Sequence, residues 1–274
     1  MKFLYNAALA FIISFHLAGI TAAQTGSNPS AQPEKSNGDV AKQLANPISN
    51  IVTAPFEWNY DRGTGYNQSG SDQTLLFQPV IPFNVGGGNI IIARPIVTAE
   101  WLNNVNGYTG AGLSNIQLET FYIPYSTSSL IWGIGPYFSS PAGSSGQFGS
   151  RQTGAGVNAV IVNQIGAWTY GVMAFQSWSM GGTATSGTAN NFYAQPFIAY
   201  VTPDAWTFSL NTQSNYNYDM HRASNPVNFD ISKLLQIDKL PIQFTIGPRY
   251  NVSSMPGWPQ GWGARAVITF VLLK

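Results

Sequence analysis

Seven charged residues lie where the chain can turn them toward the interior of one folded unit. They are Glu57, Arg94, Glu100, Glu119, Asp230, Arg249 and Arg265. Their heights along the predicted strands favour three ion pairs: Arg94 with Glu119, Glu57 with Arg265, and Asp230 with Arg249. Such pairs neutralise charges that are costly in a narrow interior. The alternative is a charged constriction that selects solutes, as rings of charge do in pores.

Catalysis has little support among the remaining residues. A hydrolase needs a nucleophile, a base and a group that orients the base. After a leader is removed, His221 is the one imidazole left, in a predicted loop beside Arg222. The chain has no Cys, so metal ligation is equally weakly supported. We therefore predict no catalytic residue, no metal site and no cofactor, and we expect a protein that is not an enzyme.

The elements that position the seven charges are twelve segments of about a dozen residues, beginning at Ser49. Their connections alternate between long and short. Long polar gaps fall at 61–72, 102–112, 139–152, 179–190, 215–225 and 252–260, with much tighter gaps between them. This asymmetry is typical of a closed antiparallel transmembrane β-barrel with short periplasmic turns and longer extracellular loops. The predicted fold is all-β, with about 12 strands over residues 49–274.

Side chains within these segments alternate between two faces. In the first strand, Phe56, Trp58 and Tyr60 share an apolar face, with Glu57 and Asn59 opposite. We expect the apolar face to contact outer-membrane lipid. In the third strand, Ile90, Ile92 and Ile96 share the inner face with Arg94, Thr98 and Glu100, so part of the lumen is expected to be apolar and filled.

The N-terminus is typical of export. Lys2 precedes an apolar stretch that ends at Thr21-Ala22-Ala23, which predicts a cleaved signal peptide over 1–23; a membrane anchor is the alternative. Residues 24–48 are predicted to be a disordered or short-helical periplasmic leader. Charged residues make up 8% of the chain and the net charge is +1, which argues against a soluble domain and a nucleic-acid partner.

Tryptophan positions provide a further indication, because indole favours membrane interfaces. Seven Trp residues are predicted to form two girdles: Trp58, Trp101, Trp178 and Trp262 at the long-loop rim, and Trp132, Trp168 and Trp206 at the short-turn rim. Trp258 is expected in the loop above. Twelve tilted strands imply a backbone diameter of about 24 Å, and side chains would leave a lumen of about 10 Å or less.

Six prolines lie inside predicted strands: Pro55, Pro79, Pro95, Pro136, Pro196 and Pro248. Each removes a hydrogen-bond donor from the ladder, and a closed barrel has no free edge to accommodate the loss. We therefore expect bulges or kinks at these positions.

Several stretches from Ala41 to the C-terminus resemble a family of bacterial outer-membrane transporters that includes proteins of the meta-pathway of phenol degradation. The matching stretches are AKQLANPISN (41–50), QPVIPF (78–83), IWGIGP (131–136), WTYGVMAFQSWS (168–179), QPFIAYVTPDAWTFSLNTQSNYNYD (195–219) and GWGARAVITF (261–270). The resemblance implies an outer-membrane barrel that takes up hydrophobic or aromatic compounds. The end at Lys274 departs from the aromatic terminus usual for recognition by the barrel-assembly machinery.

The preferred hypothesis is a passive outer-membrane channel or transporter for small molecules. Its expected partners are outer-membrane lipid, a small-molecule solute and, during biogenesis, the barrel-assembly machinery. A plugged barrel that serves as a structural protein or surface receptor is the alternative, and an outer-membrane hydrolase is a third.

The barrel prediction can be tested by electrophoresis. An unheated detergent sample should migrate differently from a boiled sample, because hydrogen bonds close the barrel in detergent until heat opens it. Equal mobility of the two samples would contradict the barrel.

Overall fold

A computed structural model describes residues 36–141, 147–183 and 189–272. Its elements are α1 (Asn37–Leu44), β1 (Val52–Thr64), β2 (Gly70–Phe77), β3 (Ile81–Gly86), β4 (Asn89–Val105), β5 (Tyr108–Leu113), β6 (Ile116–Ile123), β7 (Leu130–Ser140), β8 (Arg151–Ile165), β9 (Trp168–Thr183), β10 (Asn191–Val201), β11 (Trp206–Thr212), β12 (Ser214–Asn217), β13 (Arg222–Ile237), β14 (Leu240–Ser253) and β15 (Gly261–Leu272). The predicted signal peptide and the leader up to Lys35 lie outside these residues. No helix in the described part is long and apolar enough to cross a membrane.

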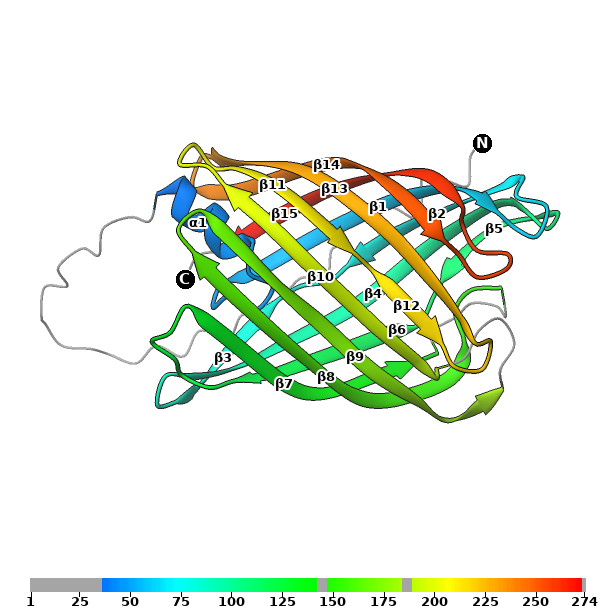
Figure 1. Ribbon diagram of the computed structural model, residues 1–274, viewed down its shortest axis with the longest axis horizontal. Coiled ribbons are helices and arrows are strands. Elements are labelled where there is room, and N and C mark those ends of the chain that lie inside the picture. Colours follow the sequence, from blue (N-terminus) through cyan, green and yellow to red (C-terminus); the bar gives the residue numbers. More distant parts are fainter. Residues whose placement is uncertain (1–35, 142–146, 184–188, 273–274) are drawn as a thin grey trace, which may run out of the picture. The chain divides into compact units, whose positions relative to one another are not determined.

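These elements form a closed antiparallel barrel of twelve strands, as predicted (Figure 1). The fifteen assigned strands reduce to twelve because short breaks divide three of them, giving β2 with β3, β5 with β6, and β11 with β12. The first and last strands pair in register from Val52 opposite Leu272 to Asp61 opposite Gly263. The backbone groups of β1 and β15 are therefore satisfied within the wall, as a membrane-spanning sheet requires.

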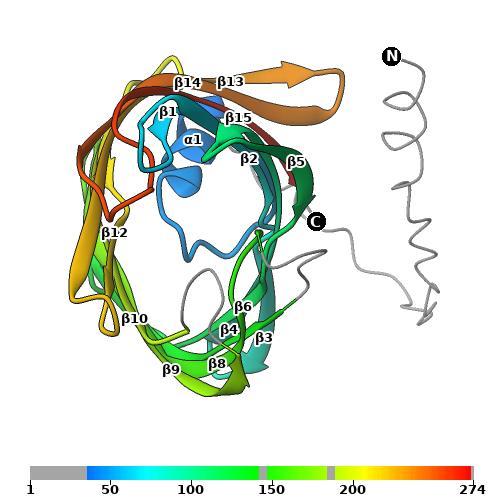
Figure 2. The same cartoon turned by 90° about the vertical axis from the view of Figure 1, so that its right-hand side faces the viewer.

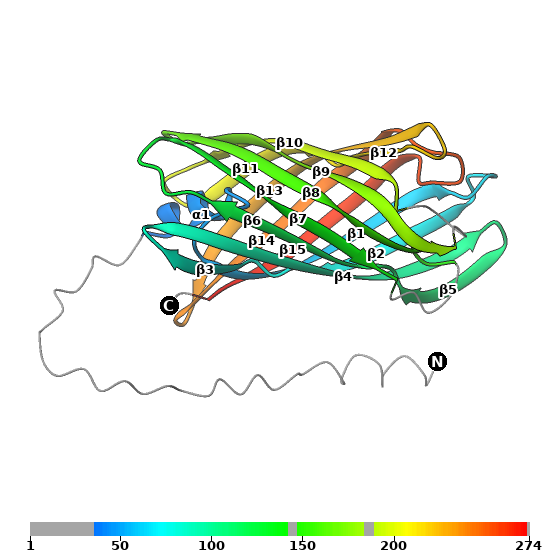
Figure 3. The same cartoon turned by 90° about the horizontal axis from the view of Figure 1, so that it is seen from below.

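The two ends of the barrel differ. At one end, called the turn end, two-residue connections such as Gly166-Ala167 and Asp238-Lys239 join the strands. At the other end, called the loop end, the strands are longer than predicted and include parts of several stretches that the sequence analysis assigned to loops. The gap at 102–112 is a hairpin whose turn is Asn106-Gly107, and the gap at 215–225 retains only the turn from Tyr218 to His221. α1 lies at the turn end, away from the β4–β5 hairpin (Figure 3).

Alternating burial along the strands separates a lumen face from an outer face. On β1, Glu57 and Asn59 are buried, whereas Phe56 and Trp58 are exposed. On β4, Ile92 and Ile96 are buried beside Arg94, so the predicted apolar part of the lumen is present. Because side chains have a period of two in a strand, the sequence pattern determines which residues line the lumen.

Several interior prolines coincide with gaps in the ladder, but the register is the same on both sides of the gaps at Pro79 and Pro136, so the expected bulges do not occur there. Pro79 lies in the break between β2 and β3, next to Pro55 and Pro95 on the two neighbouring strands. Pro136 lies where the β6–β7 ladder is interrupted, although its pairing with Val157 of β8 is intact. Since a residue in a strand has its N–H toward one neighbour, each proline weakens one side of the wall and leaves the other paired.

The segment before β1 lies inside the barrel, which the prediction of a leader did not foresee. Ser36 caps α1 by accepting a hydrogen bond from the Asp39 N–H. Val40 and Ala41 pack against Val201, Leu234 and Val271 of β10, β13 and β15. Ile48 then packs against Ile92, Phe121 and Met173 of β4, β6 and β9, on another part of the wall. The segment from Val40 to Ile48 therefore crosses the lumen at the turn end (Figure 2).

Candidate functional site

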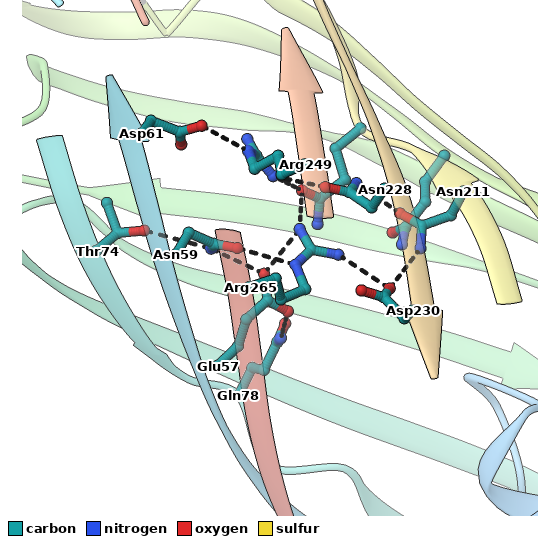
Figure 4. Close-up of polar contacts among 12 residues, drawn as sticks. Glu57, Asn59, Asp61, Thr74, Gln78, Asn211, Asn228, Asp230, Arg249 and Arg265 are labelled. Carbon is teal, nitrogen blue, oxygen red and sulfur yellow. Dashed lines mark hydrogen bonds and ion pairs between the residues drawn. The ribbon is translucent and has the colours of Figure 1, made fainter. Parts of the chain in front are cut away.

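The centre of the lumen holds a network of ion pairs around Arg265, on the last strand (Figure 4). Its guanidinium lies 3.1 Å from Glu57 Oε1 and donates to Asn59 Oδ1 at 2.8 Å. Asn59 is directly opposite Arg265 in the β1–β15 ladder, and Glu57 is diagonal to it. The predicted Glu57–Arg265 ion pair is therefore present, and it spans the seam where the barrel closes.

Two further ion pairs reach across intervening glycines. Asp230 on β13 is 3.7 Å from Arg265 on β15, and the β14 residue paired with Arg265 is Gly247. Likewise Arg249 on β14 is 3.1 Å from Asp61 on β1, and the β15 residue between them is Gly263. A Cβ on Gly247 would lie 2.7 Å from Asp230 Oδ1, and one on Gly263 would lie 2.6 Å from Asp61 Oδ1. Both glycines are thus required for these contacts.

This arrangement corrects the expected Asp230–Arg249 pair. Asp230 instead pairs with Arg265 and accepts from the Asn211 amide at 3.2 Å. Arg249 pairs with Asp61 and donates to Asn228 Oδ1 at 3.2 Å. The prediction failed because it considered only adjacent strands, whereas glycines let long side chains reach the next strand but one.

The opposite wall carries the predicted Arg94–Glu119 pair. The two residues are directly opposite on β4 and β6, and Arg94 Nη1 is 3.0 Å from Glu119 Oε2. Beside them three aromatic rings stack along the inner wall: Tyr137 on Phe175 at 4.2 Å between centroids, and Phe175 on Tyr193 at 5.0 Å. We call the Arg265 network, the Arg94–Glu119 pair and this aromatic stack together the central belt.

Two cavities occupy the lumen, and they share no lining residue. The inner cavity, about 240 Å³, is lined by Leu44 and Pro47 of the crossing segment and by polar residues such as Thr245. The outer cavity, about 400 Å³, lies toward the loop end and is lined by residues such as Thr64 and Trp258. Arg94 lines the inner cavity and Tyr137 the outer one, so the central belt lies between them.

Two acids of the lumen, Asp61 and Asp72, were not among the predicted lining residues. Asp72 lines the outer cavity together with the predicted Glu100 on the neighbouring strand. Asp72 lies directly opposite Asp61 across the β1–β2 pair. Alternation puts Asp61 on the inner face of the first strand, but it is also the first residue of the predicted loop at 61–72 and was not selected. Asp72 was assigned to the same loop, which the structure shows to be largely strand. Continued alternation from Glu57 through Asn59 to Asp61 was the signal available.

The seven girdle tryptophans all project from the outer face. Trp132, Trp168 and Trp206 stand within three residues of the starts of β7, β9 and β11, at the turn end. Trp58 lies nearer the middle of its strand than expected, because β1 continues to Thr64. Placement at a membrane interface remains a prediction for all seven. Trp258 lines the outer cavity, and His221 lies in the exposed β12–β13 turn.

Comparison with known structures supports the fold. The chain is similar to a crystal structure of an outer-membrane channel from Pseudomonas putida F1, at a TM-score of 0.64 and 10% identity, covering 81% of this chain and 95% of that one. No protein-family model and no curated protein sequence matches the chain. The low identity limits this likeness to the architecture of the barrel.

Two further solved barrels resemble the chain less closely. The KdgM porin in complex with oligogalacturonate has a TM-score of 0.47 and 10% identity, covering 81% of this chain and 99% of its own. An active-site mutant of outer-membrane phospholipase A from Escherichia coli has a TM-score of 0.48 and 12% identity, covering 86% and 98%. We draw nothing from matches this distant.

Replacement of Arg265 by Met should destabilise the barrel by about 3–5 kcal/mol, because Glu57 and Asp230 would be left as buried charges without this partner. Urea unfolding in detergent micelles measures the change. Arg222→Met, at an exposed position, is the matched control and should have little effect.

A second substitution separates charge from packing. Adding Glu57→Gln to Arg265→Met should recover part of the lost stability, since one of the unpaired carboxylates is removed. If Arg265→Met unfolds at the same urea concentration as the parent, the network does not stabilise the barrel.

Proposed function

We propose that the protein is a channel of the bacterial outer membrane that passes small solutes through its lumen. The observation that carries the proposal is the pair of cavities that follow one another along the barrel, one on each side of the central belt. A barrel with a purely structural role has no need for internal space. The likeness to a solved outer-membrane channel concerns the fold and is consistent with this proposal.

The lining of the inner cavity supports a path for hydrated solutes. Ser232, Gln243, Thr245 and Thr269 present hydroxyl and amide groups to it from β13, β14 and β15. Hydroxyls and amides can both donate and accept hydrogen bonds, so they can replace part of a solute's hydration shell. The belt limits the width of the path, which favours small molecules over oligomers.

Within this function, we infer that the solutes are aromatic or hydrophobic. The stack of Tyr137, Phe175 and Tyr193 extends across β7, β9 and β10 on the inner face, between the two cavities. Planar solutes can make stacked or edge-to-face contacts with the faces and edges that the stacked rings leave free. The resemblance of the sequence to transporters of the phenol meta-pathway points to the same class of cargo.

A plugged barrel is the second candidate, and one observation favours it. The segment from Val40 to Ile48 crosses the lumen, and residues at both of its ends are buried in apolar clusters. Such packing resists displacement, because exposing each buried apolar side chain costs about 1.5–3 kcal/mol. In this alternative the loop end would bind a partner and no solute would cross.

A hydrolytic function is not proposed. The exposed turn that holds His221 lies at the loop end, apart from the buried belt, and an exposed imidazole has no fixed orientation toward a nucleophile. We expect His221→Ala to leave any esterase activity of the parent unchanged, which an esterase assay of both proteins measures.

Export and membrane insertion are part of the proposal. The predicted signal peptide at 1–23 would direct the chain across the inner membrane, and the barrel-assembly machinery would insert it. The outer face supports contact with lipid, because it presents large apolar side chains on every side, including Phe138 on β7, Phe208 on β11 and Ile268 on β15.

Solute entry into liposomes tests the channel. We expect swelling with glycine, arabinose and benzoate, and faster swelling when residues 36–48 are deleted, since the deletion removes the segment that crosses the lumen. A mobility shift on boiling verifies that each variant has formed a barrel.

A milder variant, Val40→Asn with Ile48→Asn, places an amide at both apolar contacts and should also accelerate swelling. Lys42→Gln, on the same helix but outside the apolar clusters, is the matched control. Absence of flux in the parent and in both variants would contradict the channel, whereas flux in the two variants alone would favour the plugged barrel.

A further inference from the structure

The charges inside the barrel do not balance. Six carboxylates line the lumen from the described strands: Glu57, Asp61, Asp72, Glu100, Glu119 and Asp230. Three guanidinium groups face them, those of Arg94, Arg249 and Arg265. The other Lys and Arg residues of the described strands lie outside the belt at exposed or outward positions, and Lys42 is on α1 at the turn end. The lumen therefore holds more carboxyl groups than basic groups.

This excess is concentrated in the outer cavity. The three arginines form ion pairs with Glu57, Asp61, Glu119 and Asp230, all in the central belt. Among the described residues, Asp72 and Glu100 have no basic side chain within ion-pair distance, and no Lys or Arg lines the outer cavity. The two acids are diagonal neighbours on β2 and β4, where Asp72 pairs with Leu102 and Thr74 with Glu100.

A second observation concerns hydrogen bonding. Ten buried side-chain atoms of the described residues have no hydrogen-bond partner within the protein, and five of them belong to residues that line the outer cavity. These five atoms are all oxygens, on Thr64, Asp72, Asn115, Ser177 and Asn215. Thr64 is 4% exposed and Ser177 is 2% exposed, so these hydroxyls are deeply buried. A buried acceptor without a donor is costly, so a side-chain rotation that brings such an oxygen to an N–H donor in the cavity is favourable.

Negative charge and free oxygen acceptors in one cavity suit a cation that carries N–H groups. A bare metal ion fits less well, because the described residues contain no group of three or more His, Cys, Asp or Glu able to hold one. The walls also include Leu102, Val105 and the aromatic residues Tyr137 and Trp258. Apolar walls accommodate hydrocarbon, and aromatic faces attract cations.

We propose that the outer cavity is a binding site for small organic ammonium ions, with Asp72 and Glu100 supplying the charge and Thr64 and Ser177 accepting hydrogen bonds. This inference rests on the proposed channel, because the channel is what brings solutes to the cavity. Within that function it names cationic amines as the class of solute retained at the loop end.

Binding is tested with benzylammonium, added as benzylamine hydrochloride at pH 7, using the full barrel in lipid nanodiscs and isothermal titration. Benzyl alcohol and benzoate are matched neutral and anionic probes of the same shape, and empty nanodiscs correct for lipid partitioning. We expect saturable binding of benzylammonium alone. Benzyl alcohol binding as tightly, or no saturable binding of benzylammonium, would overturn the proposal.

The double variant Asp72→Asn with Glu100→Gln should weaken binding at least tenfold. It keeps the size of both side chains and removes two carboxylates without ion-pair partners, so the barrel should remain folded, which the mobility shift verifies. Asp238→Asn, an exposed position in the β13–β14 turn, removes one charge outside the lumen and should bind as the parent does. Unchanged binding in the double variant would overturn the assignment of these residues.

Flux in the same preparation separates this inference from the channel. Saturable binding that the double variant loses, in a barrel without solute flux, would support the site and contradict the channel. Solute flux without preferential benzylammonium binding would support the channel and contradict the site.

Discussion

The structure depends on the ion pairs that Arg265 makes across the seam of the barrel. Arg265 is on the last strand, Glu57 and Asn59 are on the first, and Asp230 is two strands away in the other direction. One guanidinium thereby joins β13, β15 and β1, where the two ends of the sheet must meet. Its five N–H donors suit this role better than an ammonium would, because they have fixed directions toward several acceptors. The same contacts occupy the middle of the lumen, so closure of the barrel also divides its interior.

Much of this architecture could be predicted from the sequence because a strand has a period of two. Alternation placed Glu57, Arg94 and Arg265 on the inner face, and strand counting brought Arg94 to Glu119 and closed β1 on β15. The Asp230–Arg249 pair was wrong because its geometry depends on Gly247 and Gly263, whose missing side chains permit contacts across a whole strand. The sequence also could not predict that the chain crosses the lumen before Ile48. The packing of Ile48 against β4, β6 and β9 leaves no periodic pattern in the sequence.

Division of the lumen has consequences for function. The belt satisfies most of its charges internally, so it limits the width of the path between the two cavities while leaving little charge to attract solutes. Asp72 and Glu100 lie beyond it, where two acids without a cationic partner meet several oxygen acceptors. The crossing segment limits the other side through apolar packing of Val40 and Ile48. A solute entering from the loop end therefore meets charge first, then aromatic rings, then a polar cavity beneath an apolar obstruction.

The central claim is that the belt separates two chambers, and cysteine labelling tests it most directly. The chain contains no Cys, so one introduced thiol gives an unambiguous signal. Thr98→Cys places it on the outer cavity and Thr245→Cys on the inner one. With a bulky, membrane-impermeant maleimide applied to intact cells, position 98 should react at least ten times faster than position 245. Equal rates at the two positions would contradict a divided lumen.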